Sequence, residues 1–247
     1  MFPIRDHNPS GRTPYVTYAL MLANIGIFLS YFWLLYDPRT EYEFYNTWAL
    51  VPIRLTNGVE PEALLTSMFL HGGWLHLAGN MLFLWIFGDN VEEEMGHLMF
   101  LVFYLACGVA AGIAQVAAAP YSNVPMVGAS GAIAGVMGGY LLLFPRAKVD
   151  IFIFFIVFFR IFPIPAWIML MIWFGIQFFG GLGTDPDQGG VAYWAHAGGF
   201  LAGFVLIIPL WLKRGAMAYW RRTDGHPPHP EARYPALESR LPKIKRR

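Results

Sequence analysis

The stretch VGASGAIAGVMGGY at residues 127–140 places Ser130 in a Gly-x-Ser-Gly turn at the head of an apolar, glycine-rich segment. Glycine allows tight backbone turns, which leave a serine hydroxyl and its own N–H exposed, as a nucleophile requires. Gly131, Gly135 and Gly139 also recur every four residues, the spacing of closely packed membrane helices in which serine is merely a satisfied polar residue. On this stretch alone, helix packing is a better interpretation than catalysis. The rest of the chain makes catalysis the favoured interpretation.

The composition is that of an integral membrane protein. The 247 residues are 56% hydrophobic and only 13% charged, and the mean hydropathy is +0.46, far more apolar than an ordinary soluble domain. The single cysteine, Cys107, lies in an apolar segment and can form no intrachain disulfide.

Six segments are predicted to span the bilayer, giving an all-α, polytopic helix bundle. Each needs about 20 apolar residues. The region 151–180 is too long for one span and contains Arg160, Pro163 and Pro165. We expect an interfacial stretch at 151–161, followed by a helix that starts near one of the two prolines. The other five predicted spans are 15–36, 63–87, 98–119, 129–144 and 191–212.

The distribution of Lys and Arg predicts that both termini are cytoplasmic. With the N-terminus inside, the inner segments hold most basic residues, ten of them in 213–247, whereas the outer loops hold only Arg39 and Arg54. The polar N-terminus shows no cleavable signal, so the first span is expected to direct its own insertion. We expect residues 1–14 to be a cytoplasmic segment, 15–212 the membrane domain, and 213–247 a basic, disordered tail attracted to anionic lipid.

The second predicted span carries three polar side chains, His71, His76 and Asn80. Polar groups are expensive inside a membrane and usually face a cavity or another helix. His76 and Asn80 are four residues apart, so they share one helix face and resemble a site. His71 is five residues before His76, which places it on another part of a helix surface, so we expect its side chain to point elsewhere and to make a structural hydrogen bond.

The acidic stretch 88–96 is predicted to be a cytoplasmic turn between the second and third spans. Its carboxylates, Glu92 among them, are expected to cap the free N–H groups at the start of the third span. Gly108 and Gly112 in that span form a small-residue face that indicates helix packing.

His196 lies in the last span, in the sequence AHAGGFLAG, whose small residues recur every four positions. The fourth span carries a matching face and is short, about sixteen apolar residues or ~24 Å, so it is expected to begin below the outer surface. If the two faces meet, Ser130 and His196 are neighbours at the starts of helices that run in the same direction. The small residues of the last span are Ala195, Gly199 and Gly203.

These side chains suffice for nucleophilic catalysis by serine, which needs a base and donors for the oxyanion. Ser130 would be the nucleophile and His196 the base, while His76, Asn80 and the Ser130 N–H would be the donors. No Asp or Glu lies in the second, fourth or sixth span, so the sequence predicts a dyad and not a Ser-His-Asp triad.

Over residues 63–203, these motifs resemble those of the rhomboid family of intramembrane serine proteases. The resemblance implies a six-helix fold with the roles just given, and cleavage of single-span membrane proteins in or near their transmembrane segments. It implies a multi-pass protein of the plasma or inner membrane, opening to the extracytoplasmic side, with no cofactor, metal or nucleic acid. The supporting residues it implies are His71, Gly128, Gly131, Gly199 and Glu92, the last bracing helix ends from the cytoplasmic side.

The sequence departs from the resemblance at two places. Some members carry an aromatic residue that stacks on the catalytic histidine, and here that position is Ala134, so His196 must be held in another way. Some also carry a Trp-Arg pair in the first outer loop, which is missing here. Neither departure removes a catalytic group.

Other classes of function fit less well. A transporter or channel would carry intramembrane charges or internal repeats, which the sequence lacks. A zinc site built from His71, His76 and His196 would need ligands that converge, whereas the first two are expected to diverge. A non-catalytic, rhomboid-like scaffold that binds transmembrane segments stays open, because it could use the same cavity.

Overall fold

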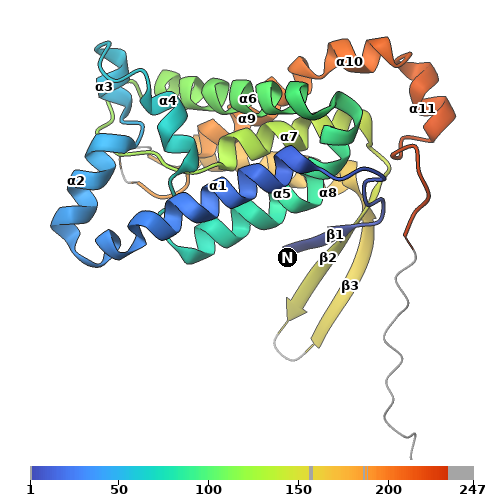
Figure 1. The fold of residues 1–247 in the computed structure, drawn as a ribbon, viewed down its shortest axis with the longest axis horizontal. Helices are drawn as coiled ribbons and strands as arrows, with labels where there is room; N and C mark the ends of the chain where they lie inside the picture. The colour runs from blue at the N-terminus through green and yellow to red at the C-terminus, as the bar shows by residue number, and fades with distance from the viewer. Residues whose placement is uncertain (1, 156–157, 186, 188, 233–247) are drawn as a thin grey trace, which may run out of the picture.

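The computed structural model describes residues 2–155, 158–185, 187 and 189–232, and its main body is a bundle of helices that run side by side along the long axis (Figure 1). The predicted helical membrane bundle is therefore confirmed. The long helices of the bundle are α1 (Tyr15–Tyr31), α5 (Trp74–Met95), α6 (His97–Ala118), α7 (Ser130–Leu143), α8 (Ala166–Gly183) and α9 (Tyr193–Leu206).

Within the described part of the chain, four helical segments are long and apolar enough to cross a membrane: Tyr15–Tyr36, His97–Ala118, Ala166–Gly183 and Tyr193–Lys213. The first of these combines α1 with the 3-10 helix η1 (Phe32–Tyr36), and the last combines α9 with α10 (Ile208–Lys213). The helix α7 is apolar but shorter, as its sequence predicts. The chain is an integral, multi-pass membrane protein.

Short helices form the end of the bundle opposite the sheet (Figure 1). The Asp37 carboxylate accepts a hydrogen bond from Thr40 N at 3.2 Å and so caps the first of them. These elements are α2 (Pro38–Trp48), α3 (Pro52–Thr56), α4 (Ala63–Thr66) and the 3-10 helix η2 (Ser67–Phe69).

The second span differs from its predicted bounds, 63–87. The chain leaves η2 in an extended conformation, and α5 begins only at Trp74, after Gly73 at φ +155°. The predicted turn at 88–96 is wrong, because α5 continues through its acidic end to Met95. It stops at Gly96, whose φ of +77° is a left-handed conformation typical of a helix end.

Glu92 braces a different helix from the one expected. Its buried carboxylate accepts hydrogen bonds from Val16 N, Thr17 N and Thr17 Oγ1 at 2.7 to 2.8 Å, so it caps the start of α1 and not that of α6. Its other close partner is His97 Nδ1, at 2.6 Å. The carboxylate reaches across the bundle because α5 extends beyond the apolar segment, which brings its acidic turn beside the first turn of α1.

The centre of the bundle is α7, in which every residue from Gly131 to Tyr140 is buried. Its glycine face meets α9 backbone to backbone. A Cβ atom on Gly199 would overlap the peptide oxygen of Gly131, and one on Gly203 would overlap that of Gly135. The predicted meeting of the two small-residue faces is confirmed, since only glycine permits so close an approach.

A three-stranded antiparallel sheet projects from the other end of the bundle (Figure 1), in the order β1 (Phe2–Asp6), β2 (Lys148–Phe155), β3 (Phe158–Pro165). The described residues of the predicted interfacial stretch, 151–161, form parts of two antiparallel strands, and the first of these strands also pairs with β1. Aromatic and β-branched residues favour this conformation. The next helix, α8, begins directly after Pro165, as expected.

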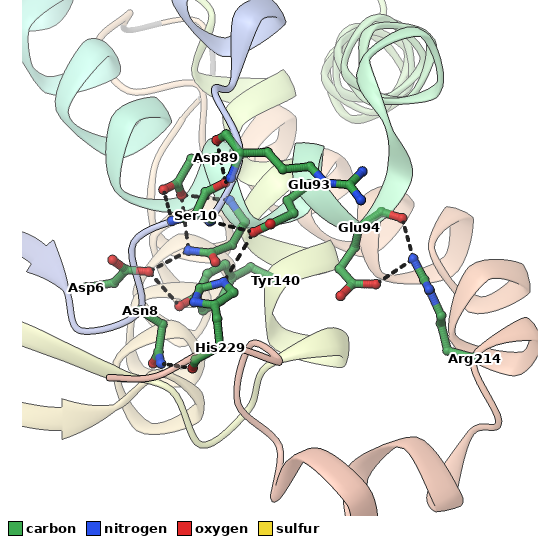
Figure 2. Close-up of polar contacts among 12 residues, drawn as sticks. Asp6, Asn8, Ser10, Asp89, Glu93, Glu94, Tyr140, Arg214 and His229 are labelled. Atoms are coloured by element: carbon green, nitrogen blue, oxygen red, sulfur yellow. Dashed lines mark hydrogen bonds and ion pairs between the residues drawn. The ribbon is translucent and has the colours of Figure 1, made fainter. Parts of the chain in front are cut away.

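The prediction of a disordered tail is wrong for residues 214–232, whereas residues 233–247 lie outside the described part. After α10, the chain forms α11 (Met217–Thr223) and packs back on the bundle. Trp220 Nε1 donates to the Leu142 carbonyl oxygen at 2.9 Å. Figure 2 shows how His229 and Asn8 then lie beside the end of α5, so that both terminal segments close this end of the bundle.

Candidate active site

Ser130 is the first residue of α7 and follows a turn that only glycine fits well. Gly128 has φ +127°, and a Cβ atom there would lie 2.7 Å from His76 Nε2. The turn is tied down because Gly128 N donates to the Ser67 carbonyl oxygen at 2.9 Å. The Ser130 N–H belongs to the first helical turn, where backbone N–H groups have no acceptor within the helix.

The structure brings Ser130 and His196 together. His196 Nε2 lies 2.8 Å from Ser130 Oγ, within hydrogen-bond distance. The contact follows from the glycine face between α7 and α9, because both residues lie in the first turns of helices that meet at Gly131 and Gly199. The pair has the geometry of a nucleophile and its general base.

The other ring nitrogen of His196 has a partner that the sequence reasoning missed. His196 Nδ1 lies 2.8 Å from Oε1 of the buried Gln177 on α8. Trp173, one turn earlier on α8, lies against the ring, with centroids 5.8 Å apart and planes tilted by 32°. A lone glutamine in an apolar membrane helix is an expensive group, and this was the signal that could have identified it.

His76 and Asn80 face the same cavity as the two candidate catalytic residues. This cavity has a volume of about 490 Å³ and is bounded by α5, α7, α8, α9 and the loops before α7 and α9. Gly72 N donates to His76 Nδ1 at 3.3 Å, so the hydrogen of the neutral ring lies on Nε2, on the side of Gly128. Asn80 is buried, and its Nδ2 has no hydrogen-bond partner among the described residues.

The expected orientation of His71 is wrong. Since α5 starts at Trp74, His71 is not helical, and its ring packs against that of His76 with centroids 5.1 Å apart. Its backbone is held by Tyr31, whose hydroxyl lies 2.5 Å from His71 N and 2.9 Å from His71 O. His71 is fully buried, and its ring supports that of His76 by direct contact.

The remaining predicted residues lie further from the cavity. Gly131 and Gly199 form the helix contact beneath the dyad, and Glu92 lies sixteen residues beyond His76 on α5, about 24 Å along the helix axis. Although the rings of His71 and His76 touch, no three His, Cys, Asp or Glu side chains in the described part of the chain are grouped to hold a metal ion.

Comparison with known proteins gives one consistent result. The family model of the Rhomboid domain matches residues 60–213. Rhomboid protein 1, mitochondrial, of Saccharomyces cerevisiae is 30% identical over 147 residues, which are 57% of this chain and 39% of that protein. Rhomboid protease GluP of Bacillus subtilis is 47% identical over 78 residues, 32% of this chain and 15% of that protein. RHOMBOID-like protein 4 of Arabidopsis thaliana is 35% identical over 153 residues, which are 62% of this chain and 35% of that protein. The chain thus spans less than half the length of these relatives.

Proposed function

The chain belongs to the rhomboid family, and from that premise we propose that it is an intramembrane serine endopeptidase whose protease domain is residues 15–212. The observation that carries the proposal is the 2.8 Å approach of His196 Nε2 to Ser130 Oγ on the wall of a cavity of about 490 Å³. The similarity to a protein named as a rhomboid protease supports the same reaction.

The proposed reaction begins when the neutral His196 ring takes the hydroxyl proton of Ser130 through Nε2, as Oγ bonds to the carbonyl carbon of the scissile peptide. The carbonyl oxygen becomes an oxyanion, and His76, Asn80 and the Ser130 N–H donate hydrogen bonds to it. The peptide C–N bond then breaks, and the leaving amine takes the proton from His196. Water attacks the acyl-enzyme with His196 again as base, releasing the new carboxyl terminus and restoring the Ser130 hydroxyl.

We propose that the cavity opens to the extracytoplasmic side. The sheet, α10 and α11 lie at the end of the bundle opposite α2 and α3 (Figure 1). Lys148 and Arg160 lie in the sheet, Arg146 directly precedes it, and α11 carries Arg221 and Arg222. Lys and Arg near membrane ends favour the cytoplasmic side. Ser130 starts a helix that runs toward this basic end, so its hydroxyl belongs near the other surface.

The proposed substrates are single-span membrane proteins. A membrane helix buries its peptide carbonyls in its own hydrogen bonds, so it must unwind before Ser130 can reach one. Cleavage should therefore favour segments with Ala, Gly or Ser, or a nearby Pro, within about two turns of the outer membrane boundary, where unwinding costs least. Replacing those residues with Leu should slow cleavage more than it weakens binding.

The test uses the purified protein in liposomes with a generic single-span substrate. Ser130→Ala and His196→Ala should each abolish cleavage while the melting temperature in detergent stays within a few degrees, since neither side chain fills a core. Mass spectrometry of the products locates the cut. Retained turnover in Ser130→Ala would overturn the proposal, whereas a scaffold would keep its binding function without Ser130. Cuts on the cytoplasmic side would overturn the orientation.

A further inference from the structure

His196 is held at both ring nitrogens, and the second contact fixes where its proton lies. Nε2 faces Ser130 Oγ and Nδ1 faces Gln177 Oε1, both at 2.8 Å. An amide oxygen can only accept a hydrogen bond, so Nδ1 must carry the hydrogen. In the neutral ring this leaves the lone pair on Nε2, directed at the serine hydroxyl, which is the tautomer that a general base needs.

We propose that Gln177 is a positioning residue that selects the productive tautomer of His196, an uncharged counterpart of the acid in a Ser-His-Asp triad. The inference rests on the proposed serine protease activity and deepens it, since it adds a third side chain to a dyad. Among the described residues, no carboxylate is hydrogen-bonded to His196, so no other side chain in that part of the chain performs this role.

Trp173 complements Gln177 from the same face of α8, four residues earlier. Its ring lies against that of His196 at 5.8 Å and is itself backed by Phe200 at 6.0 Å. The hydrogen bond to Gln177 fixes the rotation of the imidazole in its plane, and the contact with Trp173 restricts its tilt. At Ala134, where an aromatic residue could have served, the side chain is fully buried under neighbouring helices.

Burial explains why an amide suits this position better than a carboxylate. Gln177 is only 7% exposed and lies in a helix of apolar and aromatic residues. A carboxylate there would lose its hydration while the ring is neutral, and this desolvation is costly. A neutral acceptor fixes the tautomer at lower cost, but it stabilises the imidazolium of the transition state less than a negative charge would.

The titratable groups around His196 determine which side chain a pH profile of cleavage reports on. His76 on α5 is the other titratable side chain that lines the cavity, while α7 offers Ser130 and α8 offers Gln177 and Trp173. From α6, Gln115 accepts from the backbone N–H of Ala195 and does not bond the ring. A shift in profile that follows a change at Gln177 alone therefore reports on His196.

The experiment compares Gln177→Leu and Gln177→Glu with the wild type in liposomes, across pH 5 to 9. Gln177→Leu should lower kcat by about 10- to 100-fold, part of the 10² to 10⁴ that a general base contributes, with KM within about twofold. Gln177→Glu should retain activity but move the pH midpoint of kcat upward by about one unit, because a nearby carboxylate stabilises the imidazolium. In spectra of isotope-labelled histidine, Gln177→Leu should convert part of the His196 population from the Nδ1–H to the Nε2–H tautomer.

Gln115→Leu is the matched control, because it removes a half-buried amide that contacts the start of the same helix without bonding the ring. It should leave the pH midpoint and the tautomer unchanged. An unchanged kcat and pH profile in Gln177→Leu, in an enzyme whose cleavage still depends on Ser130, would overturn the positioning role alone. Cleavage that is independent of Ser130 would overturn the proposed function instead, and the tautomer measurement, which needs no activity, would still test Gln177.

Discussion

The peptide oxygen of Gly131 occupies the position that a Cβ atom on Gly199 would need, so α7 and α9 touch through their backbones. This contact sets the separation of the two helices at the level where each carries its candidate catalytic side chain. The distance between Ser130 and His196 is thus determined by two residues that have no side chains.

Gly199→Ala should push the two helices apart, since the atom in the way is backbone and cannot swing aside. We expect a loss of about 1 to 3 kcal/mol in stability, as for other overpacked sites, together with loss of cleavage. Thermal unfolding in detergent and the liposome assay measure both. Gly175→Ala on α8 is the control, because a Cβ there meets nothing within 4 Å. Wild-type activity in Gly199→Ala would show that the contact does not set the dyad.

Asn80→Ala and His76→Ala should each slow cleavage by about 10- to 10³-fold without abolishing it, since one oxyanion donor is lost and the Ser130 N–H stays. Asn80→Asp keeps the shape of the side chain but removes its donors, so it should be at least as slow as Asn80→Ala. Single-turnover kinetics at saturating substrate give the rates. An Asn80→Asp enzyme as fast as wild type would remove Asn80 from the oxyanion site.

Glu92→Ala should destabilise the protein by about 2 to 4 kcal/mol, because it leaves the start of α1 without its acceptor and removes several charge-assisted hydrogen bonds. The rate per folded molecule should change little, since Glu92 lies at the far end of α5. Glu43→Ala, on the exposed surface of α2, is the control and should change the melting temperature only slightly. Equal melting temperatures for the two variants would contradict this bracing role.

Asp6 predicts a pH dependence of stability. Burial, with the nearby Asp89, raises the pKa of Asp6 from 3.8 to about 8. Its carboxyl group accepts hydrogen bonds from Asn90 Nδ2 at 2.7 Å and from Tyr140 OH at 3.2 Å, the latter visible in Figure 2. A raised pKa means that the folded state favours the protonated acid. The stability that it contributes is complete below about pH 4 and is lost as the pH rises through 8.

The measurement is the melting temperature of wild type and Asp6→Asn in detergent from pH 5 to 9. The wild type should lose stability relative to Asp6→Asn as the pH rises. Asp150→Asn in the same sheet is the control. Burial acts to raise the pKa of Asp150, but hydrogen bonds from His7 and Arg5 outweigh burial and lower it. The stability that ionised Asp150 contributes is therefore lost only in acid. The difference in melting temperature between Asp150→Asn and the wild type should stay constant from pH 5 to 9. Parallel curves for Asp6→Asn and the wild type would contradict the raised pKa.

The sequence predicted the helical bundle and the proximity of Ser130 to His196 because both depend on patterns that survive without tertiary information. Long apolar segments indicate spans, and two small-residue faces at the same spacing indicate helices that meet. The pairing of the polar groups then follows from the helix directions. Their roles in catalysis stay predictions.

The features that the sequence did not predict depend on partners distant in the chain. Residues 151–159, which make up much of β2 and β3, are an unbroken apolar run in the sequence. Such a run has no polar alternation to distinguish a strand from a membrane segment. Gln177 gains significance only when α8 places it beside His196. The end of α5 carries charges that are typical of a loop, yet it is helical. There the Glu92 carboxylate accepts hydrogen bonds from the first turn of α1. The tail is rich in proline and charge, yet Trp220 anchors it on Leu142.

The pairing of β1 with β2 has a consequence for how the protein is made. Phe2 pairs with Phe152, and His7 bonds both Lys148 and Ala232. Because synthesis proceeds from the N-terminus, residues 2–7 must wait for most of the chain before their partners leave the ribosome. Closing so long a loop is slow compared with forming the helices. Residues 2–7 are thus translated long before their partners and are among the last to reach their native contacts.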